Sequence, residues 1–293
     1  MKILITGASG LLGQYLNLEF SNNYQIMSLY NSNIGNCNKL NSVKLDLNDF
    51  DKCRKLLKDF SPDLVIHTAA VSSPITAQKL SSKVVYNTNV NVSKNIAEIC
   101  NSIKSKLIYT STDLVYAGYR GSMLNEDAKL MPISIYAETK LMGEQVIKNT
   151  AENFIILRLA LLYGFGLNHS RNHFQQMYEQ LRNKLSVKLF VDQFRTPLSL
   201  FEAARMIEKI VKADVTNETI NLGGVERVSR YELGERLCDI ANLDKSFLEK
   251  ITMDDIPEIP KVQDVSLNTD KLKLLGIKQK SIEESIKEIL ELK

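Results

Sequence analysis

Short runs of apolar and β-branched residues alternate along the first two thirds of the chain with longer stretches whose apolar positions recur at helical spacing. The expected strands are 3–6, 24–30, 43–45, 63–67, 106–110 and 154–159, and the expected helices are 11–20, 49–59, 77–102 and 134–151. A nearly all-apolar strand such as 63–67 is typical of a parallel sheet whose two faces are both covered by helices.

The rhythm changes after Gly166, where helices are expected near 170–184, 199–213, 230–241 and 281–290 with shorter strands between them. Ser229 and Glu232 have the spacing of a capping box, which sets the start of a helix and has no functional meaning. Pro257 and Pro260 mark a late loop.

This pattern predicts an α/β protein: a Rossmann-type, doubly wound parallel sheet with a smaller C-terminal substrate-binding lobe and a cleft between the two. We expect residues 1–165 to form a dinucleotide-binding domain, joined by a returning segment near 187–213. Residues 166–293 would be mainly the substrate-binding lobe.

The composition restricts the broad class of protein but does not indicate a function. The chain has 293 residues, of which 44% are hydrophobic and 24% charged, as in ordinary globular proteins. A net charge of +3, with lysines interleaved among acids, argues against a nucleic-acid partner. No run of eighteen apolar residues predicts a membrane span, and no room is left for a signal peptide, so we expect a cytoplasmic protein. The four cysteines are scattered and contain no C-x-x-C.

A glycine-rich turn follows the first expected strand and opens the first helix. Its spacing is G-x-x-G-x-x-G, from Gly7 to Gly13. Such a turn lets the backbone approach a pyrophosphate and points amide groups at it from the helix N-terminus. We therefore expect a dinucleotide to contact Gly7, Ser9, Gly10, Leu11, Leu12 and Gly13.

The segments after the next strands suggest which dinucleotide binds. The second strand ends in Tyr30-Asn31-Ser32, with no acid for a ribose 2′-hydroxyl and no arginine for a 2′-phosphate. The missing acid favours NADP, with NAD as the alternative. Asp46 and Leu47 are candidates for the adenine edge, although Asp46 fits a solvated turn almost as well. Ala69 and Ala70 are small enough for the cofactor to lie close.

Candidate catalytic groups lie in one helix and at the end of one strand. Tyr136 and Lys140 share a helix face, one turn apart, so that an ammonium group could favour the phenolate. Ser111 and Thr112 follow the strand 106–110, at the sheet edge where open α/β folds bind ligands. A hydroxyl group there could hold a substrate carbonyl oxygen.

Taken in order, these motifs resemble the extended short-chain dehydrogenase/reductase superfamily over essentially the whole chain, including Asn89 and the segment from Arg158 to Gly164. The resemblance selects Thr112 as the catalytic hydroxyl, four places before Tyr116, with Ser111 as the alternative. Within the superfamily the chain looks most like the dTDP-4-dehydrorhamnose reductase family. The matching pieces are 111–113, 192–197 and 263–267.

That resemblance implies hydride delivery to the C4 keto carbon of a deoxyhexose nucleotide. Tyr136 would be the general acid, Lys140 would lower its pKa and bond the nicotinamide ribose, and Thr112 would orient the carbonyl. Asp113 and Arg195 would bind substrate, and the guanidinium fork of Arg195 suits a pyrophosphate. A surface arginine that caps a loop is the alternative for Arg195.

The chain departs from the family in Arg195-Thr196-Pro197, where a glycine and a Pro-Thr pair are expected, and in Tyr116-Ala117-Gly118, which replaces aromatic-Asp-Gly. Both departures lie near the expected sugar-nucleotide pocket and concern the identity of the sugar. Arg158 fits a structural ion pair. His169 and His173 have helical metal-site spacing but lack a glutamate and a third ligand, so no metal is expected.

Three other functions remain open on the sequence. A nucleotide-sugar epimerase or dehydratase would use the same tyrosine and lysine but retain NAD. A regulatory role, like that of the methionine adenosyltransferase β subunit that resembles these reductases, would act through a partner. A reductase of another substrate is the third. A homodimer is the default oligomer for such enzymes.

Overall fold

The centre of the fold is a sheet of seven parallel strands, described by a computed structural model that covers residues 1–256 and 260–292. Its order is β11-β6-β5-β4-β1-β2-β3. The strands are β1 (Lys2–Thr6), β2 (Gln25–Tyr30), β3 (Ser42–Lys44), β4 (Leu64–His67), β5 (Lys106–Thr112), β6 (Phe154–Leu159) and β11 (Glu218–Leu222). The order reverses between β1 and β4, which is where a doubly wound sheet binds its ligand. The predicted fold class is confirmed.

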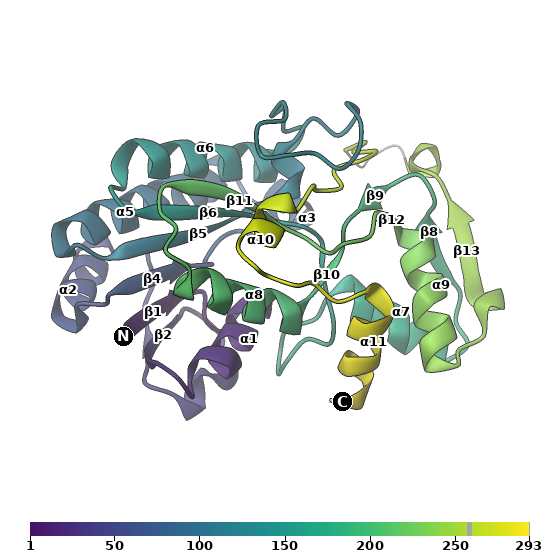
Figure 1. Ribbon diagram of the computed structural model, residues 1–293, viewed down its shortest axis with the longest axis horizontal. Helices are drawn as coiled ribbons and strands as arrows, with labels where there is room; N and C mark the ends of the chain where they lie inside the picture. Colours follow the sequence, from purple (N-terminus) through teal and green to yellow (C-terminus); the bar gives the residue numbers. More distant parts are fainter. Residues whose placement is uncertain (257–259, 293) are drawn as a thin grey trace.

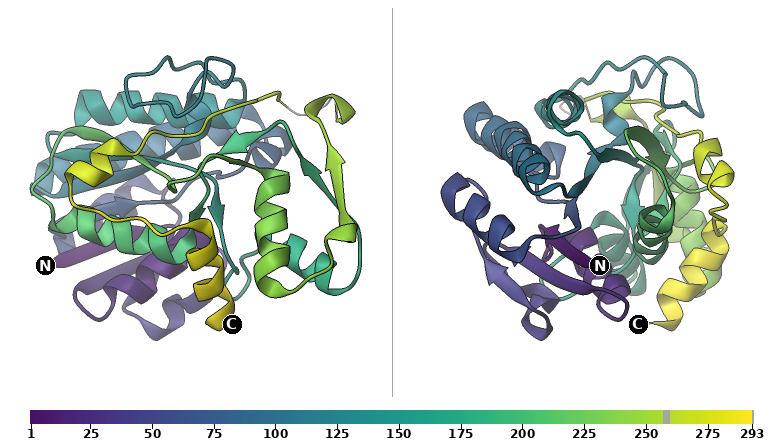
Figure 2. Two further views of the ribbon diagram at one scale, coloured as in Figure 1. Left: turned by 45° about the vertical axis from the view of Figure 1, so that its right-hand side comes forward. Right: turned by 60° about the vertical axis from the view of Figure 1, so that its left-hand side comes forward.

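Alternating side chains of the strands bury the two faces of the sheet under different helices. Ile3 and Ile5 share one apolar core with α1 (Leu11–Phe20) and α8 (Leu200–Lys212). Leu4 points the other way, into the core formed with α2 (Phe50–Phe60), α5 (Val92–Ile103) and α6 (Ile135–Thr150). Figures 1 and 2 show these helices as layers on either side of the sheet.

A smaller lobe follows with its own apolar core (right side of Figure 1). Its elements are α7 (His173–Arg182), β8 (Val187–Phe190), α9 (Arg230–Ala241), β13 (Leu248–Ile251) and α11 (Ile282–Glu291). Short pairs connect it to the body: β7 (Leu162–Tyr163) with β10 (Leu198–Ser199), and β9 (Phe194–Arg195) with β12 (Val228–Ser229). The predicted capping box is confirmed, with Ser229 and Glu232 bonding each other's backbone amides.

The segment expected to return near 187–213 divides between the two parts of the molecule. Strand β8 pairs with β13, and its buried Val187 and Leu189 pack in the core of the smaller lobe, so its assignment to the body was wrong. The return is made by α8, which packs on α1, and then by β11, which joins the edge of the main sheet. Pro260 lies in the expected loop, whereas Pro257 lies outside the described residues.

The single helix expected over 77–102 is also wrong. The chain forms α3 (Pro74–Lys79), α4 (Ser82–Tyr86), a π-helical turn η2 (Asn87–Asn91) and then α5. Leu80 is extended and Ser81 caps a new helix, so the first break has a local cause. The π turn contains buried Asn89, whose amide group bonds both backbone groups of Val71. Among the described residues, no helix is long and apolar enough to cross a membrane.

A buried ion pair joins helix α6 to the sheet. Arg158 of β6 and Glu144 of α6 are 1% and 0% exposed, and their closest charged atoms are 2.7 Å apart. Arg158 also donates to the hydroxyl group of Tyr116, which donates to Asn221 on β11. Ser111 donates to the same carboxylate at 2.5 Å. The structural role expected for Arg158 is therefore confirmed.

Removing one partner of this pair should strongly destabilise the protein, because the other charge is left buried without compensation. We expect Arg158→Met to lower the free energy of unfolding by about 3–5 kcal/mol. The exposed pair between Lys52 and Asp49 provides the control, and Lys52→Met should cost less than about 1 kcal/mol. Urea denaturation measures both; equal losses in the two variants would contradict this account.

Candidate active site

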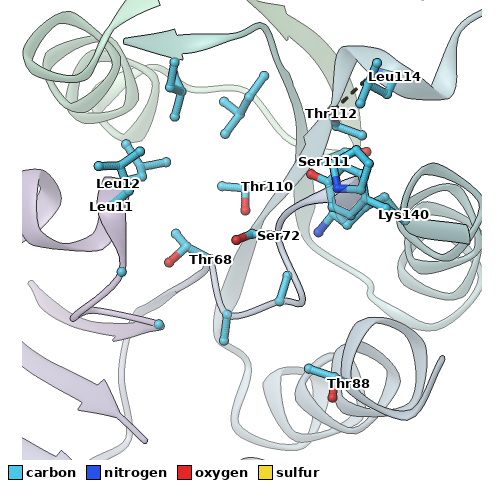
Figure 3. A pocket seen from close by; sticks show the side chains of 18 of the residues that line it. Leu11, Leu12, Thr68, Ser72, Thr88, Thr110, Ser111, Thr112, Leu114 and Lys140 are labelled. Atoms are coloured by element: carbon cyan, nitrogen blue, oxygen red, sulfur yellow. Dashed lines mark hydrogen bonds between the residues drawn. The ribbon is translucent and has the colours of Figure 1, made fainter. Parts of the chain in front are cut away.

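A cleft of about 780 Å³ lies at the carboxyl ends of the parallel strands and extends to the smaller lobe. Every residue that the sequence assigned to cofactor, catalysis or substrate lines it: Gly7, Ser9, Gly10, Leu11, Leu12, Gly13, Asp46, Leu47, Ala69, Ala70, Thr112, Asp113, Tyr136, Lys140 and Arg195. Figure 3 shows Leu11 and Leu12 on one side of the cleft, with Thr112 and Lys140 on the other. The fold thus brings these residues together, while their roles stay predictions.

The glycine turn has the close packing that a phosphate cradle needs. Gly7 has a φ of +64°, and a Cβ atom there would lie 2.7 Å from the backbone nitrogen of Ala69. A Cβ atom on Gly13 would overlap the carbonyl oxygen of Gly7 and lie 2.7 Å from the Cα atom of Ala8. Only glycine fits at both positions, and the backbone stays open to a pyrophosphate at the start of α1.

The far end of the cleft beyond β2 carries no charge that would select between the two nicotinamide cofactors. Asn31, Ser32 and Asn33 line it after the end of the strand. Asp46 also lines the cleft, but its carboxylate accepts hydrogen bonds from the backbone and side chain of Asn48 at 3.0 and 2.8 Å. Asp46 therefore serves a turn as well as the wall of the cleft.

The two candidate hydroxyl groups at the end of β5 have different partners. Strand β5 runs two residues further than expected and ends at Thr112. The hydroxyl group of Ser111 donates a hydrogen bond to Glu144. Thr112 instead hydrogen-bonds the side chain of Tyr136 and donates to Asp113 at 3.2 Å. Thr112 is thus the hydroxyl group next to the candidate acid.

Burial acts on the tyrosine and the lysine in opposite directions. It raises the pKa of Tyr136 to about 12, helped by the charge of Asp113 and opposed by the hydrogen bond with Thr112. It lowers the pKa of Lys140 to about 7, opposed by Glu144. In the protein alone, desolvation thus outweighs the lowering of the Tyr136 pKa that was expected from Lys140.

Two arginines and one aspartate form the end of the cleft nearest the smaller lobe. The Nε atom of Arg195 lies 3.4 Å from Asp113 Oδ2, and both side chains are buried. Arg230, partly buried at the first position of α9, also lines the cleft. Burial, and then the charge of Arg195, lowers the pKa of Arg230 to about 10. Two guanidinium groups facing one carboxylate leave an excess of positive charge that suits an anion.

The sequence reasoning missed Arg230, because Ser229 and Glu232 already explained that segment as a helix start. A signal was present nonetheless. A cation at the first position of a helix is unfavourable beside the positive end of the helix dipole, so an arginine there indicates a role other than stabilising the helix. His173 is the first residue of α7, and desolvation, followed by the charge of Arg230, lowers its pKa to about 4, whereas His169 lies outside that helix. Within residues 1–256 and 260–292, no three His, Cys, Asp or Glu side chains gather as metal ligands.

The parallel sheet, its glycine turn and the Tyr136–Lys140 pair beside it define an extended short-chain dehydrogenase/reductase. More narrowly, the chain belongs to the family described as RmlD substrate binding domain, whose model matches residues 1–293.

The proteins to which this chain is similar carry names of different kinds. Methionine adenosyltransferase 2 subunit beta of Xenopus laevis is 28% identical over 96% of this chain and 84% of its own. dTDP-4-dehydrorhamnose reductase of Aggregatibacter actinomycetemcomitans is 25% identical over 89% of this chain and 87% of its own. The solved dTDP-4-dehydrorhamnose reductase of Bacillus anthracis, in complex with NADP, has a TM-score of 0.87 at 23% identity and covers 100% and 99% of the two chains.

The depressed pKa of Lys140 predicts how stability depends on pH. Its pKa is about 7 in the folded chain against the ordinary 10.5, so between these values the unfolded chain binds a proton that the folded chain does not. The free energy of unfolding of the wild-type protein therefore rises by up to about 1.4 kcal/mol per pH unit between the two pKa values. Below pH 7 the folded chain also carries the charged lysine, so the full cost of burying the ammonium group is present there.

Lys140→Met removes this contribution while it keeps a long side chain. We expect the variant to be more stable than wild type by a few kcal/mol at pH 6.5, with the advantage shrinking steadily toward pH 9.5. Urea denaturation of both proteins at three pH values measures the difference. A difference that stays constant over this range would rule out the depressed pKa.

Proposed function

We propose that the protein is an NAD(P)H-dependent reductase of a 4-keto-deoxysugar nucleotide, similar in its reaction to dTDP-4-dehydrorhamnose reductase. The observation that carries this proposal is the presence of Thr112, Tyr136 and Lys140 in one cleft with the glycine turn. Family membership and the reductase relatives support it.

The reduction needs a proton at the carbonyl oxygen as the carbon receives a hydride. With a pKa near 12, Tyr136 is protonated at neutral pH and can donate that proton. Thr112, which bonds Tyr136, would donate to the same oxygen and orient the carbonyl group. Lys140 would favour the phenolate that remains, so that the proton is released more easily.

The glycine turn and the cleft wall fit a dinucleotide. Gly7, Gly10 and Gly13 would admit its pyrophosphate, while Ala69 and Ala70 leave room beside it. When bound, the reduced nicotinamide supplies the hydride. The neutral segment after β2 holds no acid to repel a 2′-phosphate, so we favour NADPH over NADH.

The charged end of the cleft would hold the diphosphate of the sugar nucleotide. Arg195 and Arg230 supply guanidinium groups, which match phosphate oxygens. Asp113 balances one of them and has a buried carboxylate oxygen without a hydrogen bond, which would accept from a sugar hydroxyl. This end of the cleft supports an anionic, hydroxylated substrate over an uncharged ketone.

A second candidate function is that of a subunit acting through a partner protein. It is favoured by the relatives named methionine adenosyltransferase 2 subunit beta, which match almost the whole chain. The intact Thr112, Tyr136 and Lys140 favour catalysis instead. Cofactor binding without turnover of any keto-sugar nucleotide, together with capture of a synthetase partner, would select the subunit role.

Loss of the phenolic hydroxyl should remove the proton donor and leave the cleft intact. We expect Tyr136→Phe to lower kcat about 10²- to 10⁴-fold with dTDP-4-dehydro-6-deoxy-L-mannose and NADPH. The dissociation constant for NADPH should change little. Tyr119→Phe is the matched control, because Tyr119 is exposed and does not line the cleft. Full activity of Tyr136→Phe would refute the assigned acid.

The glycine turn can be tested with a pair of Gly→Ala substitutions, both of which force a residue with a side chain to adopt a positive φ. Gly7 and Gly276 have φ values of +64° and +69°, but only Gly7 has neighbours that a methyl group would strike. We expect Gly7→Ala to weaken NADPH binding at least about tenfold, and Gly276→Ala to leave it unchanged. Fluorescence titration measures both constants, and equal affinities would exclude the turn as the binding site.

A further inference from the structure

The ammonium group of Lys140 has an aromatic ring as its near neighbour. Its Nζ atom lies 4.0 Å from the ring centroid of Tyr109, and the lysine is 2% exposed. Across the part of the chain that the structure describes, no carboxylate pairs with this ammonium group and no hydrogen bond from it is found. Burial without such a partner would ordinarily drive a lysine to its neutral form.

Tyr109 is fixed at this position from several sides. It belongs to β5 and is fully buried, and its hydroxyl group lies 3.4 Å from the backbone carbonyl oxygen of Lys140. The side chain of Ser93 also hydrogen-bonds it. Gly143, three residues after Lys140, makes room for it, because a Cβ atom there would overlap the Tyr109 hydroxyl group. The ring therefore cannot leave the lysine without repacking of α6.

The other ionisable groups around Lys140 do not replace the ring. Glu144 lies on the same helix and favours the charged lysine, but its carboxylate is already paired with Arg158. His67 approaches from β4 and is neutral near pH 7, because burial lowers its pKa to about 3. Tyr136, one turn earlier on α6, is protonated and uncharged at that pH.

We propose that Tyr109 is a positioning residue, whose ring face holds the Lys140 ammonium group charged and in place behind Tyr136. The attraction between a cation and the face of a tyrosine ring strengthens where water is excluded, as it is here. The inference rests on the proposed function for its catalytic consequence, since it assigns Tyr109 a part in keeping Lys140 cationic during the reaction. Tyr109 acts through Lys140 and does not line the cleft.

The test is a titration of Lys140 in the whole protein labelled with ¹⁵N-lysine. Its ζ signal is assigned by its loss in Lys140→Arg. Tyr109→Phe keeps the ring and loses the hydroxyl group, so we expect the Lys140 pKa to remain near 7. Tyr109→Leu removes the ring, and we expect the pKa to fall by about one, as for a desolvated cation–π contact. The upper limb of the pH profile of kcat/KM should move down by the same amount.

A graded replacement keeps the test decisive if the leucine variant does not fold. Phenylalanines with one, two and three ring fluorines at position 109 keep the ring's shape while they weaken the attraction of its face for a cation. The Lys140 pKa should fall with each fluorine. A flat fluorine series, or equal pKa values in folded Tyr109→Phe and Tyr109→Leu, would overturn the proposal.

The outcome separates the two proposals. If the wild-type protein fails to reduce a keto-sugar nucleotide, the proposed function fails, and the titration still decides what the ring does to Lys140. If turnover is present and the titrations do not depend on the ring, only the assignment of Tyr109 fails.

Discussion

The buried ion pair between Glu144 and Arg158 ties helix α6 to the sheet, and the geometry of the cleft depends on it. Glu144 also accepts a hydrogen bond from the hydroxyl group of Ser111, so the same carboxylate anchors the end of β5. Because Tyr136 and Lys140 lie on the helix that carries Glu144, their distance from β5 is set by this contact. A paired, fully buried charge is costly to disturb, and this suits a site that must stay preorganised.

Charge within the cleft follows the chemistry proposed for each part. Glycine and alanine backbone lines the end beneath the first helix, whereas Arg195 and Arg230 supply cationic charge at the end near the smaller lobe. Between these ends, Tyr136 is held protonated and Lys140 is held near its titration point. In the proposed reaction, an anionic substrate that enters from the lobe side would meet the protonated Tyr136 beside the glycine turn.

Much of this could be predicted from the sequence, because its signals are local. The first helix was predicted at 11–20, where it forms, since a glycine turn and an apolar period bound it. The break at Leu80 and Ser81 was missed because helical periodicity continues through it, and the π turn depends on a tertiary bond from Asn89.

The sequence did not single out Arg230 or Tyr109, and the reason differs from that for the helix break. Arg230 lies within the capping box of Ser229 and Glu232 but takes no part in it, and Tyr109 stands in no spacing motif. Each acquires its neighbours only when distant segments meet: α9 with the end of β9, and β5 with α6. The strand β8 was misassigned for the same reason, because its pattern of burial fits either part of the molecule and only its pairing with β13 decides. Contacts of this kind are set by tertiary packing, which periodicity does not encode.

The central claim, net hydride transfer to a keto-sugar nucleotide, is tested most directly with NADPH that carries deuterium in the transferable position. The account predicts that each NADPH oxidised adds one deuterium to the sugar carbon of the product, which mass spectrometry detects. A product that contains no deuterium, or an epimerised or dehydrated product formed without net loss of NADPH, would contradict it.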